Sequence, residues 1–392
     1  MFRQVLAVSL MNLRSVPQRW GTSLVIVVGI AGVVGVLTAI LAMGEGFRAT
    51  LGQAGKEDRV IVLRSGATSE LTSGLGREAV DLVKGSPGVA RNAAGRPIAS
   101  AEILVIADLP KRGTGTLANA PIRGVQPEAF DVRPEVQIVA GRLFDAGPRE
   151  LIVGRGAASQ FEGLEIGARL AFRDADWTVV GEFSADGGVH ESELWGDAET
   201  VMSAYRRGGF QSVTAQLESI GTLEPLAAAL SDDPRLNVEA QTLSAYYAGQ
   251  SRQMSLIINV IGHTIGYIMA IGALFGALNT MYAAVSSRSR EIATLRALGF
   301  GGGAIVASVL LEALLLALLG GLLGGGLAWL IFNGYTVSTL GANFSQVAFD
   351  FRVTGVLLIK GLSWALVIGL LGGLLPAWRA ARQPVTTALR AL

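Results

Sequence analysis

Residues 21–43 read GTSLVIVVGIAGVVGVLTAILAM, which is 23 consecutive residues without a charged side chain. As an α-helix this stretch would be about 35 Å long, more than the roughly 30 Å hydrocarbon core of a bilayer. It is also longer than the apolar region of a cleaved signal peptide, about 7–15 residues, and no clear A-x-A site follows it. These features predict a retained transmembrane helix.

Three further apolar stretches follow later in the chain, at 255–285, 304–332 and 354–377. Apart from His263, Glu312 and Lys360, one in each stretch, they hold no acidic or basic residue. The sequence therefore predicts four transmembrane helices, one before and three after a polar segment at 44–254.

The overall composition excludes several classes of protein. Of 392 residues, 51% are hydrophobic and only 16% are charged, against roughly 25% charged in a soluble domain. A net charge of +1 argues against a strongly basic nucleic-acid binder and against a disordered acidic chain. No cysteine and only two histidines leave no material for thiolate or multi-histidine metal sites. We expect no metal, no cofactor and no nucleic-acid partner.

The charges are distributed unevenly, and this predicts the orientation. Residues 44–252 hold 28 of the 31 acids and 21 of the 32 bases. Arginines dominate before the first span, between the second and third, and after the fourth: Arg3, Arg14, Arg19, Arg288, Arg290, Arg296, Arg379, Arg382 and Arg390. The loop 333–353 carries only Asp350 and Arg352.

By the positive-inside rule, the arginine-rich segments face the cytoplasm. These segments are an amphipathic N-terminal stretch at 1–20, the loop 286–303 and the tail 378–392. The segment 44–254 then lies outside. We expect a multi-pass protein of the cytoplasmic (inner) membrane with both termini inside.

The outer segment has a mixed α/β pattern. Two separated β-α-β units, which could pair into one small sheet, are expected from strands at 59–64, 98–106, 212–217 and 236–240 with helices at 75–84 and 223–230. Residues 108–210 would be an insertion with short strands at 150–153, 168–172 and 177–180, and with a polar, mobile loop at 109–120. Stretches 44–55 and 243–254 predict helical stalks. The fold class is an α-helical membrane protein with an α+β extracytoplasmic domain.

The loop after the second span reads SSRSREIATLRALG at 286–299. Ile292, Leu295 and Leu298 recur at helical spacing among charged residues, and Gly299 is typical of a helix end. This pattern predicts a short amphipathic helix. It could lie on the membrane surface or dock onto a cytoplasmic partner.

Polar and small residues within the spans predict packing. Glu312 would lie about 12 Å deep by helix rise, so we expect it to face protein or water, hydrogen-bonded, with a proton relay as the alternative. Lys360 can snorkel toward an interface. Glycines at small-xxx-small spacing let helix backbones approach closely. They are Gly320, Gly321, Gly324, Gly325, Gly369 and Gly373.

No catalytic residue is predicted. The sole Gly-Lys pair, Gly55-Lys56, lacks the rest of a Walker A loop. His190 with Asp186, Glu191 and Glu193 could suggest a metal cluster, but a solvated loop is the preferred interpretation because no second imidazole lies nearby. Likewise Ser363 and His263 could form an intramembrane dyad, but a packed serine and a hydrogen-bonded histidine are expected.

Several of these stretches together resemble the FtsX-domain ABC permeases of the MacB/LolC/LolE group. They are REIATLRALG at 290–299, EALLLALLGGLLG at 312–324, LPAWRAA at 375–381 and, more loosely, GR at 141–142 and WTVVG at 177–181. The resemblance implies one span, a large outer domain and three further spans. It also implies a permease dimer with two ABC ATPase subunits. Because the chain starts about 20 residues before its first span, the ATPase is expected on a separate polypeptide.

The implied mechanism is mechanotransmission, in which the ATPases push the 286–299 helix and the outer domains move. On this resemblance, Ile292, Leu295 and Leu298 form the docked apolar face, Glu291 is the anchor, and Arg288, Arg290 and Arg296 make charge contacts. The substrate stays open among a drug, a peptide, a lipid and a lipoprotein. Export would involve a periplasmic adaptor and an outer-membrane channel, whereas lipoprotein extraction would involve a second, different permease. An FtsX-like activator of cell-wall hydrolases is the alternative, and an intramembrane enzyme a weaker one.

Overall fold

The structure is a computed structural model that describes residues 20–172, 175–340 and 346–383. The predicted N-terminal segment and most of the tail after Gln383 lie outside the described residues. The chain divides into two units, which we call the helical unit and the α/β unit. The helical unit comprises Met1–Glu45, Ile257–Tyr335 and Phe351–Leu392, and the α/β unit comprises Gly46–Leu256 and Thr336–Asp350.

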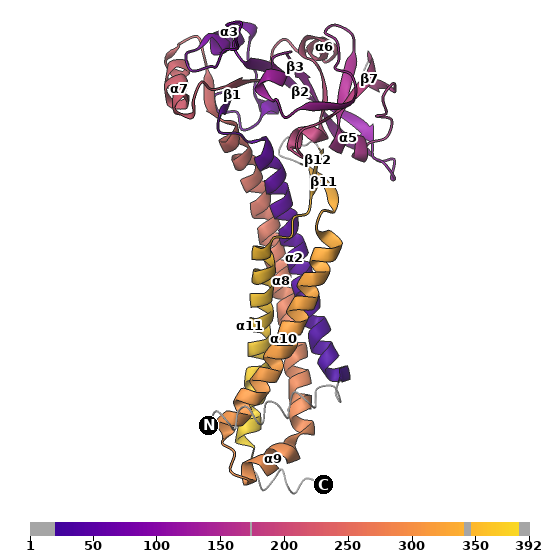
Figure 1. The fold of residues 1–392 in the computed structure, drawn as a ribbon, viewed down its shortest axis with the longest axis vertical. Helices are drawn as coiled ribbons and strands as arrows, with labels where there is room; N and C mark the ends of the chain where they lie inside the picture. Colours follow the sequence, from indigo (N-terminus) through magenta and orange to yellow (C-terminus); the bar gives the residue numbers. More distant parts are fainter. Residues whose placement is uncertain (1–19, 173–174, 341–345, 384–392) are drawn as a thin grey trace. The chain divides into compact units, whose positions relative to one another are not determined.

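The helical unit is built on four long helices, drawn in Figure 1. They are α2 (Trp20–Ala54), α8 (Leu243–Ser287), α10 (Gly302–Phe332) and α11 (Gly355–Arg382). Each is long and apolar enough to cross a membrane, which confirms the four predicted spans. The predicted stalks are uninterrupted parts of the first two, because α2 continues to Ala54 and α8 begins at Leu243.

Glycines allow α10 to pack closely on its neighbours. A Cβ added at Gly324 would overlap the carbonyl oxygen of Ala31 on α2. A Cβ at Gly369 of α11 would overlap the side chain of Ala317 on α10. Added Cβ atoms would also lie within 3.0 Å of neighbouring atoms at Gly320, Gly321 and Gly373, and at 3.2 Å at Gly325. These glycines therefore allow helix contacts within one chain, where side chains of any size would separate the backbones.

The α/β unit contains one ten-stranded sheet, in the order β10-β1-β9-β2-β3-β8-β5-β7-β4, with β6 paired to β7. The strands are β1 (Arg59–Arg64), β2 (Ala99–Pro110), β3 (Leu117–Val125), β4 (Gln137–Gly141), β5 (Glu150–Gly154), β6 (Arg169–Phe172), β7 (Ala175–Ser184), β8 (Leu194–Asp197), β9 (Ser212–Gln216) and β10 (Val238–Thr242). The helices are α3 (Arg77–Gly85), α4 (Ala129–Val132), α5 (Arg155–Gln160), α6 (Ala198–Ala204) and α7 (Leu223–Asp232).

Strand β2 joins two parts of this sheet. Residues 99–102 pair with β9, whereas residues 103–110 pair with β3. Strands β1, β2, β9 and β10, with helices α3 and α7, are therefore the two β-α-β units that the sequence predicted. They pair with one another in the order β10-β1-β9-β2, but as one end of the ten-stranded sheet and not as a separate small sheet. The expected insertion boundary at 108 falls inside β2. The polar loop expected at 109–120 is largely β-paired, with its turn between Lys111 and Thr116, so that prediction is wrong.

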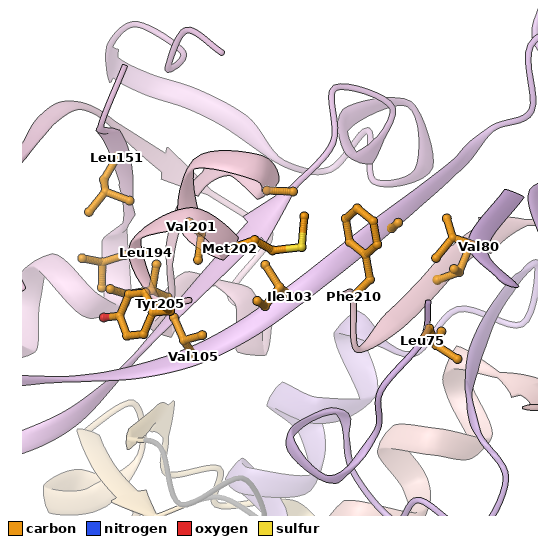
Figure 2. Packing of buried hydrophobic residues seen from close by; sticks show 14 of the residues in the cluster. Leu75, Val80, Ile103, Val105, Leu151, Leu194, Val201, Met202, Tyr205 and Phe210 are labelled. Atoms are coloured by element: carbon orange, nitrogen blue, oxygen red, sulfur yellow. The ribbon is translucent and has the colours of Figure 1, made fainter. Parts of the chain in front are cut away.

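The core of the α/β unit lies between this sheet and its helices. Figure 2 shows Ile103 and Val105 of β2 near Val201 and Met202 of α6, with Phe210 completing the layer. These side chains are buried because alternate residues of a strand point to the same face of the sheet. The result is a rigid platform for the charged side chains described below.

The sequence predicted only a short loop at 333–353, but the structure contains a hairpin there. Strands β11 (Thr336–Leu340) and β12 (Gln346–Asp350) pair antiparallel. The hairpin belongs to the α/β unit, where the Ala348 N–H donates to Ser192 Oγ at 2.8 Å. The chain therefore enters this unit a second time between α10 and α11.

Candidate functional site

The first candidate site is the short helix α9 (Ser289–Ala297), which follows α8 after a break at Arg288. It ends as predicted, because Gly299 adopts a φ of +92° that residues with a Cβ rarely tolerate. Its length of nine residues gives one buried and one exposed side.

A buried ion pair fixes the start of α9. Arg288 Nη1 donates to Glu312 Oε2 of α10 at 2.8 Å, and each side chain is only 7% exposed. This ion pair lines a small cavity between α8, α9 and α10, together with Ile292 and Val309. Glu312 thus faces protein rather than lipid, as its cost in hydrocarbon requires. The prediction that Arg288 offers its charge to a partner is wrong, because its guanidinium faces inward.

The remaining predicted residues divide between the two sides of α9. Ile292 is buried in the core of the helical unit, so it cannot form the docked face that the sequence predicted. Leu298 is 72% exposed, and Leu295 is half-buried. Glu291 and Arg290 are also exposed. The exposed side of α9 therefore carries charged residues, and the exposed Leu298 follows at its C-terminal cap.

Arg296 is the remaining basic residue of this helix. It is half-buried, and its Nη1 donates to the Gln383 carbonyl oxygen at 2.6 Å. This bond ties α9 to the chain just after α11.

The second candidate site is a buried group of charges in the α/β unit, which we call the Arg123 cluster. Its members are Arg123, Arg133, Glu70, Glu102, Glu193 and His190. The Arg123 guanidinium donates to Glu193 at 2.8 and 2.9 Å, to Glu70 at 2.7 and 3.0 Å and to Glu102 at 2.8 Å. Arg133 donates to both oxygens of Glu102 at 2.5 and 3.0 Å. All six residues are buried.

Histidine and aromatic groups surround the cluster. His190 Nδ1 lies 3.2 Å from Glu193, and the indole N–H of Trp195 donates to the same carboxylate at 2.7 Å. His190 Nε2 lies 3.4 Å from the hydroxyl of Tyr247, and the Tyr246 hydroxyl accepts the Glu70 backbone N–H at 3.3 Å. Both tyrosines belong to α8.

The environment sets the protonation states of these groups. Burial alone would raise the pKa of Glu193, but Arg123 and His190 outweigh burial and hold this pKa well below its usual range. Burial likewise raises the pKa of Glu102, while Arg133 and Arg123 bring it below its ordinary value. Burial lowers the pKa of His190 despite the neighbouring Glu193. At neutral pH the cluster therefore holds ionised carboxylates beside a neutral imidazole.

These contacts correct the sequence interpretation of His190. A solvated loop was expected, but the imidazole is buried and bonded on both nitrogens. Among the described residues, no three His, Asp or Glu side chains come together in a geometry that could hold a metal ion. Glu191 instead accepts the Ala185 and Gly187 backbone N–H groups, at 2.7 and 2.9 Å.

Ser363 and His263 each bond within their own helix. Ser363 Oγ donates to the Lys360 carbonyl at 2.7 Å, and His263 Nδ1 donates to the Asn259 carbonyl at 2.7 Å. Both polar groups are thus satisfied as the structural interpretation expected, although Ser363 is exposed rather than packed.

Comparison with known families identifies what kind of chain carries these two sites. Residues 263–385 match the family described as FtsX-like permease C-terminal. Residues 23–233, more than half of the chain, match the MacB-like periplasmic core domain. The chain belongs to the MacB/FtsX-like permease family. This permease is accordingly a multi-pass membrane protein.

Individual relatives of the permease are distant. The uncharacterized ABC transporter permease YknZ of Bacillus subtilis is 24% identical over 205 residues, covering 51% of this chain and 49% of that protein. A macrolide export ATP-binding/permease protein MacB of Shewanella sp. (strain ANA-3) is 24% identical over 408 residues, covering 94% of this chain and 57% of that protein. The permease thus spans about half the length of these relatives.

Solved structures of isolated domains are also similar. The extracellular domain of YknZ aligns at 16% identity and a TM-score of 0.36, covering 47% of this permease and all of that domain. The periplasmic region of MacB from Actinobacillus actinomycetemcomitans aligns at 13% identity and a TM-score of 0.37, covering 49% of the permease and 92% of that region.

Sequence reasoning missed the most densely charged part of the permease. Glu102 lies in the apolar run AEILVIAD, and Arg123 lies in PIRGV. A lone charge inside a buried strand is a signal for a buried partner. The partners themselves come from segments far apart in the chain, so periodicity alone does not reveal them.

Proposed function

We propose that this permease is the membrane subunit of an ABC transporter, and that it passes ATP-driven movement to its α/β unit by mechanotransmission. One observation carries the proposal: α9 presents an exposed charged side while a buried ion pair fixes its other side to α10. Force applied to the exposed side would therefore move the long helices as well as α9.

Two of the long helices could carry such a movement into the α/β unit. Helices α2 and α8 each run unbroken from the helical unit into the α/β unit. By the positive-inside rule, the arginine-rich loop with α9 faces the cytoplasm and the α/β unit faces outward. The force then comes from ABC ATPase subunits bound at α9, and the substrate is handled by the α/β unit.

Relatives named for macrolide export favour export of a hydrophobic small molecule, peptide or lipid over other uses. A second permease copy or homologue, a periplasmic adaptor and an outer-membrane channel are the further partners that we propose. The catalytic step, hydrolysis of ATP, is assigned to the ATPase domains.

Co-purification tests the proposal directly. The permease is co-expressed with a candidate ABC ATPase subunit, and a Glu291→Lys/Leu298→Asp variant is compared with the parent. Because both changed side chains are exposed, the variant should fold normally. It should co-purify with about one tenth or less of the ATPase that the parent retains. Leu117→Asp provides a matched control, since Leu117 is 71% exposed in the α/β unit. Undiminished ATPase binding by the α9 variant would sink the proposal.

A further inference from the structure

The chain connects the helical unit to the α/β unit through three routes: α2, α8 and the hairpin β11–β12. Within the α/β unit, side chains from all three routes line one small cavity of about 30 Å³. Phe47 comes from α2, Tyr247 from α8 and Gln346 from the hairpin, and the opposite wall includes Arg123 and Glu193. All three segments therefore border one cavity beside the Arg123 cluster.

Each route also makes its own specific contacts there. From α8, the Tyr246 and Tyr247 hydroxyls reach the Glu70 backbone and His190, and both side chains are buried. Burial raises the pKa of both tyrosines, so their hydroxyls stay protonated and able to donate.

The hairpin and α2 meet beside the same cavity. The Ala348 N–H of the hairpin donates to Ser192, the neighbour of Glu193, at 2.8 Å. Phe349 packs edge-on against Phe47 of α2, with ring centroids 5.5 Å apart. The hairpin is therefore held to α2 and to Ser192, and all of these contacts lie beside the cavity that the cluster also lines.

A buried ionic cluster is an unusual way to stabilise a domain. Desolvation offsets most of the Coulomb attraction, so such groups contribute little net stability compared with apolar replacements. They are, however, intolerant of displacement, because a slip that separates one partner leaves a buried charge uncompensated, at a cost of several kcal/mol. Apolar contacts can slide and repack with a much smaller penalty. The cluster therefore favours one fixed arrangement of the segments around it.

We propose that the Arg123 cluster is the joint that makes the α/β unit follow α2, α8 and the hairpin as one body, with Arg123 and Tyr247 as positioning residues. This inference rests on the proposed function. It adds that transmission depends on a specific buried charge network, which can be removed while the fold and the ATPase site stay intact.

The test uses the variant Arg123→Met/Glu70→Gln/Glu193→Gln. It removes three charges from the Arg123 cluster and keeps side chains of similar volume. Glu102 keeps its partner Arg133 in this variant, so no buried charge is left alone. The chain has no cysteine, so single-cysteine reporters can be placed cleanly. Leu117→Cys reports on the sheet of the α/β unit, and Ala248→Cys, at an exposed position next to Tyr247, reports on the part of α8 that belongs to the same unit. The permease is reconstituted in nanodiscs with the ATPase bound. Energy transfer from a donor dye on each cysteine to acceptor-labelled lipids then measures how far that position moves when ATP is added.

In the permease with the unchanged Arg123 cluster, ATP should change the energy transfer at both positions. With the neutral joint, the shift at position 248 should persist while the shift at 117 falls by at least half, at an unchanged ATPase rate and melting temperature. An undiminished shift at 117 overturns the joint alone. No shift at either position with the parent joint overturns the proposed function, and the joint with it.

A milder variant guards against misfolding of the triple variant. Tyr246→Phe/Tyr247→Phe removes two hydroxyls and keeps both rings, and it should reduce the shift at 117 partially. Tyr267→Phe, at an exposed tyrosine of the same helix, is the matched control and should change nothing. Equal shifts in the double variant and this control would contradict the assignment of Tyr247.

Discussion

The buried pair Arg288–Glu312 makes a quantitative prediction about how α9 is held. Arg288→Met removes the cation that faces the Glu312 carboxylate, and Glu312→Gln removes the carboxylate that faces the Arg288 guanidinium. Since both side chains are 7% exposed and their contact is 2.8 Å, each single change should cost about 3 kcal/mol, the low end for breaking a buried pair. The double variant, which removes both charges of this pair, should cost only about 1 kcal/mol. The two residues are thus expected to couple by about 5 kcal/mol in a double-mutant cycle.

Unfolding of the purified permease by SDS in mixed micelles, followed by tryptophan fluorescence, gives the four free energies that the cycle needs. An exposed pair supplies the control. Arg77 and Glu199 approach to 2.6 Å with side chains 60% and 53% exposed, so their cycle should give under about 1 kcal/mol. Additive costs at Arg288 and Glu312, or single costs below about 1 kcal/mol, would show that the pair is solvated and does not fix α9.

Three further outcomes are expected. Gly324→Ala should destabilise the permease by about 1–3 kcal/mol, because its Cβ would overlap a carbonyl oxygen of α2. Gly326→Ala, whose Cβ meets nothing within 4 Å, should instead stabilise it slightly, by up to about 1 kcal/mol, in the same SDS titration. The melting temperature should fall as pH drops from 7 to 4: the pKa of His190 is lowered from 6.5 and that of Glu193 from 4.5, so the unfolded chain binds protons first. His190→Gln should remove the part of that fall above about pH 5, and a pH-independent melting curve would contradict the assigned protonation states. Ser363→Ala should leave transport unchanged in a vesicle assay.

The sequence predicts what is encoded locally. A run such as 21–43 carries its own free energy of insertion, and the arginines beside each span act on their immediate neighbourhood. The helix at Ser289–Ala297 could also be predicted from the sequence, because apolar spacing and a terminal glycine are local patterns. Strand β1 was predicted from its β-branched content alone and matches its observed bounds.

The interactions that determine the two sites are non-local. Arg288 belongs to a cytoplasmic loop by the charge pattern, yet its guanidinium is buried against Glu312, which lies 24 residues away in the next helix. Arg123 and Glu193 are 70 residues apart. Charge and spacing do not distinguish such residues from solvated ones, since only the tertiary fold decides which face of a strand or helix is covered.

The hairpin was missed for a different reason. Its strands are short, and they lie between two apolar spans that dominate the hydropathy of this part of the sequence. Alternation was nevertheless visible, because Val347 and Phe349 are buried while Gln346, Ala348 and Asp350 are more exposed. A period of two over five residues is a weak signal, and its significance comes from the contact with Ser192.

The two buried ionic groups lie at opposite ends of one helix. Tyr246 and Tyr247, near the first residue of α8, contact the Arg123 cluster, and Arg288 follows its last residue. If the permease works as we propose, α8 must be held firmly at both ends, and the Arg288–Glu312 ion pair at one end and the hydrogen bonds of Tyr246 and Tyr247 at the other provide directional contacts that apolar packing alone does not.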